Sequence, residues 1–147
     1  MIKGKFPFDL NFYIKLSKDV VPMFRKHTFM DALDINDKKF KQYSTGYGKA
    51  KRTGGLKRQA SEFKNTTAPV LTSDLLRDWK LQGTSSTGFF FGTATQGGKI
   101  KNLERLGRVI STDKNPVPKK ISKFIMKEAE RYVQSRLNKI KGGTFNI

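Results

Sequence analysis

The sequence predicts an α+β fold, in which a small antiparallel hairpin packs against an N-terminal helix and a long C-terminal helix. Apolar residues follow helical spacing over residues 118–140. Two β-prone runs, 79–84 and 88–94, flank the turn sequence SSTG. A third pattern, over 17–33, is helical and apolar. The chain has 147 residues, which is the size of one domain.

The N-terminal part is expected to pass from a strand into a helix. Every second residue from Phe6 to Phe12 is apolar, which is typical of a strand. Ser17 is a suitable cap for the helix over 17–33, where Pro22 is tolerated close to the start.

Residues 34–68 are expected to form a long basic arm or loop. Gly46, Gly48, Gly54 and Gly55 interrupt any helix there. Apolar anchors are few, so the segment cannot build a core of its own. We therefore expect it to gain order against another chain. Its cations are Lys38, Lys39, Lys41, Lys49, Lys51, Arg52, Lys57, Arg58 and Lys64.

A short helix is predicted where the sequence reads VLTSDLLRDWK. Thr72 or Ser73 can cap it, and Asp74 is favourable near its positive end. Its buried side is expected to consist of Leu75, Leu76 and Trp79.

The hairpin that follows contains three consecutive phenylalanines. Phe89 and Phe91 are expected on one face and Phe90 on the other. Aromatic residues on both faces suggest that both faces are covered.

The last helix is predicted to begin near Pro118, which suits a first helical turn. The Gly142–Gly143 pair ends it and leaves 141–147 as a flexible tail. Its apolar face comprises Ile121, Phe124, Ile125, Ala129, Tyr132, Val133, Leu137 and Ile140. A second face carries a cationic stripe, which is formed by Lys119, Lys123, Lys127 and Arg131.

Charge restricts the classes of function. Thirty Lys and Arg oppose twelve Asp and Glu, giving a net charge of +18. Such a surface attracts polyanions, above all nucleic acid, because phosphate contacts release counterions. There is no cysteine, which excludes disulfides and thiolate metal sites. No apolar run is long enough for a membrane span, and we expect no membrane partner.

Catalytic and cofactor motifs are weak. Gly48–Lys49 lacks both the earlier glycine and the following Ser or Thr of a phosphate-binding loop. His27 is the only histidine and lies among apolar residues, which favours a structural role. We therefore predict no enzyme activity, no cofactor and no metal.

Three carboxylates precede the basic arm, at Asp31, Asp34 and Asp37. A metal-dependent nuclease can use such a set. The same spacing is also common for capping and solubilising charges. A small nuclease is therefore one hypothesis, and Asp34→Ala tests it.

Aromatic residues and cations alternate in the arm, with Phe40, Tyr43, Tyr47 and Phe63 among the lysines and arginines. This mixture can stack single-stranded bases. It also suits a protein–protein contact, where Tyr and Arg are enriched. Composition does not separate the two.

Two stretches, DKKFKQYSTGYGKAKR at 37–52 and VLTSDLLRDW at 70–79, resemble in their order the tail-completion or virion-morphogenesis proteins of tailed bacteriophages. The chain departs from the family pattern at Gln42, Ser73 and Asp78. The matching positions are Phe40, Tyr43, Ser44, Tyr47, Lys49, Leu71, Thr72, Leu76 and Arg77.

The resemblance implies a virion protein that forms a homo-oligomeric ring, six-fold or twelve-fold, at the head–tail junction. Its partners would be the head connector, the tail tube and genomic DNA in the lumen. The expected subunit interface comprises Phe40, Tyr43, Tyr47, Leu75, Leu76 and Trp79. Contacts with DNA or an acidic partner are expected from Lys49, Lys51, Arg52, Lys57 and Arg58, and secondarily from Lys119, Lys123, Lys127 and Arg131. The alternative is a stand-alone basic nucleic-acid-binding protein.

Overall fold

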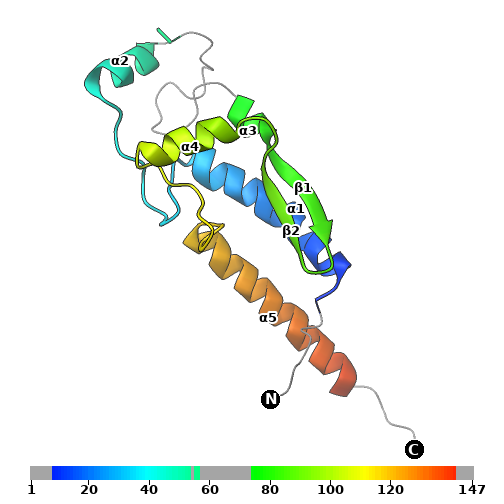
Figure 1. Cartoon of the computed structure of the whole chain (residues 1–147). Helices are drawn as coiled ribbons and strands as arrows, with labels where there is room; N and C mark the ends of the chain where they lie inside the picture. Colours follow the sequence, from blue (N-terminus) through cyan, green and yellow to red (C-terminus); the bar gives the residue numbers. More distant parts are fainter. Residues whose placement is uncertain (1–7, 54, 57–73, 142–147) are drawn as a thin grey trace, which may run out of the picture.

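The computed structural model describes residues 8–53, 55–56 and 74–141 and confirms the α+β class. Helix α1 (Leu10–Arg25) packs against the hairpin of β1 (Trp79–Ser85) and β2 (Gly88–Thr93) and against helix α5 (Lys119–Lys141). Figure 1 shows the hairpin alongside α1, while α5 runs on beyond the other elements.

Helix α1 begins earlier than the sequence pattern predicts. The Asp9 side chain accepts a hydrogen bond from the Phe12 N–H at 2.9 Å and caps the helix. Phe8, just outside the cap, stacks on Phe12 with ring centroids 4.6 Å apart. The strand expected from Phe6 to Phe12 is therefore wrong from Leu10 onward, because cap and ring packing stabilise a helix there. The start of that strand lies outside the described residues.

The end of α1 also differs from the expected helix over 17–33. Ser17 is not a cap: it lies buried within α1, and its Oγ donates to the Ile14 carbonyl at 2.8 Å. Pro22 lies inside the helix. A five-residue π-helical segment, η1 (Lys26–Met30), then continues α1, and the Asp31 N–H bonds the Lys26 carbonyl five residues earlier.

The described first part of the expected arm, residues 34–53 and 55–56, folds onto its own chain. Asp34 Oδ1 accepts from two backbone N–H groups and closes a turn, which is completed by a bridge between Leu33 and Lys39. Helix α2 (Thr45–Thr53) follows, so the two glycines inside it, Gly46 and Gly48, do not prevent a helix. The expectation that Gly46 and Gly48 interrupt any helix is therefore wrong. Residues 57–68 lie outside the described residues.

The hairpin is confirmed almost to the residue. Ser85 pairs with Gly88 across the turn, and Ser85 Oγ accepts from the Thr87 N–H at 3.2 Å. A bulge interrupts the register between Leu81 and Gly83. Phe90 is 69% exposed, so its face is not covered as expected.

Two short helices flank the hairpin along the chain, one before β1 and one after β2. Helix α3 (Asp74–Asp78) is the predicted short helix, whereas α4 (Gly97–Arg105) was not predicted. Asp78 joins them, since its carboxylate accepts from the Thr95 and Gln96 N–H groups at 2.8 and 3.1 Å. These bonds lower the pKa of Asp78. The hydrogen bonds that hold the start of α4 therefore come from a residue distant in sequence.

The core lies where α1 meets the hairpin. Phe24 stacks on Trp79 at 4.8 Å and meets the edge of Phe91 at 5.3 Å. Ile121 extends this cluster to the start of α5, whose bounds match the predicted 118–140 within one residue. The other buried apolar members are Leu16, Val20, Phe29, Ala32, Phe40, Leu75 and Ile110.

Candidate interaction surfaces

The apolar residues expected at a subunit interface mostly belong to the core of their own chain. Phe40, Leu75 and Trp79 are each 5% exposed or less. Leu76 is half-buried and packs on the same core. Burial within the chain shows that the first three pack inside their own subunit, and in this conformation they leave almost no surface for a neighbour. The helical and hairpin patterns that identified them describe core packing equally well.

Two of the expected interface residues form an aromatic pair at the start of α2. Tyr43 and Tyr47 lie 4.8 Å apart between ring centroids, and Tyr47 remains partly exposed. The Arg108 guanidinium lies 4.0 Å from the Tyr43 ring centre and donates to the Lys41 carbonyl at 2.6 Å. Arg108 is buried and holds this region to the rest of the chain. No local pattern in the sequence points to this role of Arg108.

Lys51 is part of the same cluster and is not an external contact. Its side chain is 1% exposed, with Nζ 4.7 Å from the Tyr43 ring centre. Burial, and secondly the charge of Arg108, lower the pKa of Lys51 from 10.5 to about 8. The expectation that Lys51 meets DNA or an acidic partner is therefore wrong for this conformation.

The other four arm residues expected to contact DNA or an acidic partner divide into two groups. Lys49 and Arg52 lie exposed on α2, where a polyanion can reach them. Lys57 and Arg58 lie outside the described residues.

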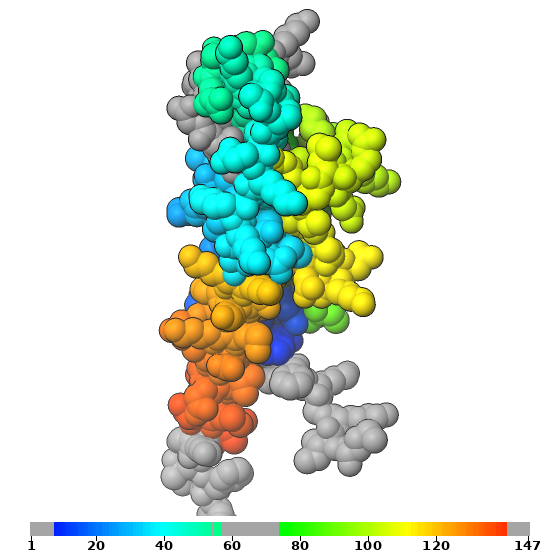
Figure 2. All heavy atoms as spheres, turned by 90° about the vertical axis from the view of Figure 1, so that its left-hand side faces the viewer, coloured from blue at the N-terminus to red at the C-terminus, as the bar shows by residue number. Residues whose placement is uncertain are grey.

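The cationic stripe of α5 is exposed along its length. Lys119, Lys123 and Lys127 all face solvent, and Arg131 does so while pairing with Glu128 at 2.5 Å. Figure 2 shows α2 and α5 at opposite ends of one face of the molecule.

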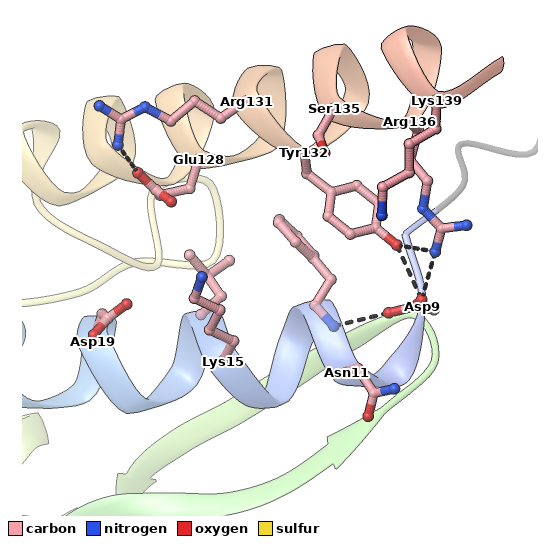
Figure 3. A pocket seen from close by; sticks show the side chains of 12 residues that line it. Asp9, Asn11, Lys15, Asp19, Glu128, Arg131, Tyr132, Ser135, Arg136 and Lys139 are labelled. Carbon is pink, nitrogen blue, oxygen red and sulfur yellow. Dashed lines mark hydrogen bonds and ion pairs between the residues drawn. The ribbon is translucent and has the colours of Figure 1, made fainter. Parts of the chain in front are cut away.

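A groove of about 780 Å³ separates α1 from the second half of α5 (Figure 3). At its end, Asp9 accepts from Tyr132 Oη at 3.0 Å and pairs with Arg136 at 2.8 Å. The Phe12 N–H, the Tyr132 hydroxyl and the Arg136 charge lower the pKa of Asp9. The walls carry both signs of charge, so the groove is no simple anion site. It is lined by Asp9, Asn11, Phe12, Lys15, Leu16, Asp19, Glu128, Arg131, Tyr132, Ser135, Arg136 and Lys139.

His27 is buried and holds two elements together. Its Nε2 lies 2.8 Å from Asp37 Oδ1, and Asp37 also accepts from the Lys120 N–H at 3.1 Å, in the first turn of α5. Asp37 has a backbone φ of 64°, in the left-handed region. The pair thus links the π-helical segment to the start of the last helix.

The three carboxylates considered for a nuclease have separate partners. Asp31 pairs with Lys26 at 3.2 Å, Asp34 bonds backbone N–H groups, and Asp37 bonds His27. Within residues 8–53, 55–56 and 74–141, no three His, Asp or Glu side chains converge as metal ligands.

Local bonds occupy much of the negative charge. In the part of the chain that the structure describes, Asp9, Asp31 and Glu128 form ion pairs with Arg or Lys. Asp34 and Asp78 bond mainly backbone N–H groups. The exposed cations therefore dominate the outer surface.

None of the described helices combines the length and the hydrophobicity that crossing a bilayer requires. Comparison of the chain with protein-family models, with curated proteins and with solved structures returned no match, so no family is assigned by similarity.

Proposed function

We propose that this chain is a structural protein of a tailed-phage virion, which assembles into a homo-oligomeric ring at the head–tail junction. Connector and tail-tube proteins would be its neighbours, and genomic DNA would pass through the lumen. Its residues act by contact and carry out no reaction.

The observation that carries the proposal is the incompletely covered apolar face of α5. Ile121 at its start is 1% exposed and packs in the core, whereas Met126, Leu137 and Ile140 are 61%, 46% and 67% exposed. Successive helical residues turn by about 100°, so the last three lie on one side of α5 that points away from the side of Ile121. Exposed apolar residues that share one side of a helix are typical of a subunit completed by neighbours.

The cation surplus supports the second part of the proposal. A net charge of +18 requires a polyanion or acidic partners wherever copies are held close together. Exposed cations on α5 and α2 supply the contact sites. DNA in a lumen provides phosphate at high density.

The test is the state of assembly. Light scattering during size-exclusion chromatography should give a mass several times 16.7 kDa, and negative-stain images should show rings. In a tailed particle, averaging about the tail axis should place the copies between head and tail. A chain that stays monomeric at every concentration and salt tested, and that is missing from purified particles, overturns the proposal.

The exposed cations also favour a second candidate, a stand-alone nucleic-acid-binding protein. It predicts tight binding of free DNA or RNA by the monomer, weakening steeply as salt is raised. The ring proposal instead predicts weak binding by a single copy and tighter binding by the assembled form. Titrating labelled DNA at two salt concentrations, with the oligomeric state measured in parallel, separates them.

A further inference from the structure

The hairpin is a two-stranded sheet whose outer edges are open among the described residues. Apart from their mutual pairing, neither β1 nor β2 makes a backbone hydrogen bond to another described segment. Helix α1 packs on one face of the sheet (Figure 1). Two strands alone are a marginal sheet, and open edges are templates for further strands.

The edge formed by β2 lacks the features that usually prevent an exposed strand from pairing with another molecule. Charged residues, proline and inward-pointing lysines discourage pairing between molecules. Strand β2 has the sequence GFFFGT, with neither a charge nor a proline. Its Phe90 is 69% exposed on the face away from α1, where a neighbouring strand could cover it.

The hairpin is also the place where two strongly cationic chains can approach. Residues 81–98 contain no charged side chain, although 29% of the whole chain is charged. Lys80 in β1 is the only charged residue of the two strands. At any surface where cations cluster, contact between two copies would bring positive charges face to face, and they would repel each other.

We propose that the hairpin is the surface through which copies of this chain join, with β2 of one copy pairing with β1 of the next. Backbone hydrogen bonds would extend the sheet across the interface, and Phe90 would be buried there. The inference rests on the proposed function, since it names the interface of that oligomer.

The head-to-tail arrangement follows from the two different edges. Pairing β1 with β1 would bring two copies of Lys80 to one edge, and like charges across strands are destabilising. Pairing β2 with β2 avoids that charge but stops at a dimer. Pairing β2 with β1 places Lys80 against an uncharged strand and allows a ring to close.

The first experiment compares Phe90→Lys with Leu106→Lys, a position just after α4 that belongs neither to the hairpin nor to α5. Both side chains are mostly exposed, at 69% and 66%, so neither change should unfold the chain, which circular dichroism would check. Sedimentation should show that Phe90→Lys dissociates the oligomer to monomer and that Leu106→Lys leaves it intact. An oligomer that survives Phe90→Lys overturns the inference and leaves the ring proposal standing. A wild-type monomer overturns the ring proposal as well.

The second experiment uses the absence of cysteine. Gly83 and Phe90 face each other across the hairpin, and a side chain at Gly83 meets no atom within 4 Å. A mixture of Gly83→Cys and Phe90→Cys chains, treated with a thiol cross-linker that spans one strand spacing of about 5 Å but not two, should give a covalent dimer. Each variant alone should not. Cross-linking by Phe90→Cys alone overturns the head-to-tail arrangement, and cross-linking in no sample overturns the interface.

Discussion

Asp9 joins the two ends of the described chain through a single carboxylate. One oxygen caps α1, and the other bonds Tyr132 and Arg136, more than a hundred residues later in α5. A short polar residue in front of an apolar stretch is a recognised cap signal. The alternating phenylalanines around Asp9 point to a strand instead, so local pattern alone selects the wrong structure.

Asp9→Asn should lower the urea midpoint of unfolding at neutral pH, because the charged cap and the Arg136 ion pair are lost. The pKa of Asp9 is lowered in the folded state from 3.8, so the unfolded chain takes up the proton first as the pH falls. The stabilisation is therefore complete above pH 3.8 and disappears as the pH falls through the lowered value.

The measurement is a series of urea titrations of wild type and Asp9→Asn from neutral to acid pH. The two curves should converge in acid, where wild type carries a neutral carboxyl. Asp19→Asn is a suitable control, because Asp19 lies exposed on the same helix. A constant difference between wild type and Asp9→Asn at all pH values would contradict the electrostatic explanation.

Arg108 and Lys51 show why buried cations escape sequence inspection. Arg108 reaches the Lys41 carbonyl across 67 positions of sequence, and no local pattern encodes that distance. Lys51 lies in a row of similar lysines and arginines, of which Lys49 and Arg52 are exposed. Composition identifies the cationic segment correctly but cannot say which of its members the fold encloses.

Among the elements, those with regular spacing were predictable. The apolar period of α5 and the turn chemistry of the hairpin each determine a local structure, and both are confirmed. Helix α4 was missed because its two opening glycines weaken helix propensity, while Asp78 supplies the bonds from outside. Helix α2 was not predicted because its glycines lower the helix propensity of the segment. The contact between Tyr43 and Tyr47 stabilises the helix, but it can be seen only in the folded structure.

The contact between α1 and the hairpin should dominate stability. Phe24 is fully buried between Phe29, Trp79 and Phe91. Phe24→Ala should therefore lower the free energy of unfolding by about 3–5 kcal/mol, through lost burial and a cavity. Met126→Ala, at a position 61% exposed, should change it by about 0.5 kcal/mol or less. Urea unfolding followed by Trp79 fluorescence measures both, and equal effects would contradict the assignment of the core.

At the scale of the whole molecule, charge and shape act together. Exposed cations lie on α5 and α2, two helices at opposite ends of one face, while the hairpin is almost free of charge. Self-association through the hairpin would therefore gather cationic surfaces without opposing them directly. An oligomer of this kind would have a higher affinity for a polyanion than one copy has, because many weak contacts become simultaneous.

This arrangement predicts that DNA affinity depends on where the cations lie as well as on how many there are. Replacing Lys119, Lys123 and Lys127 by Gln removes three exposed charges from α5. If each contacts a phosphate, the slope of log affinity against log salt should fall by about 2.7, because each contact contributes about 0.9. Fluorescence anisotropy with a duplex at several salt concentrations measures that slope.

The matched control replaces Lys18, Lys38 and Lys114, which are equally exposed but lie outside α5. It removes the same net charge, so a purely long-range attraction would respond equally to both triple variants. We expect the control to keep most of the wild-type slope, since counterions are released only where a side chain meets a phosphate. Equal losses in the two variants would mean that DNA binds diffusely to the whole cationic surface, and α5 would then have no special part in it.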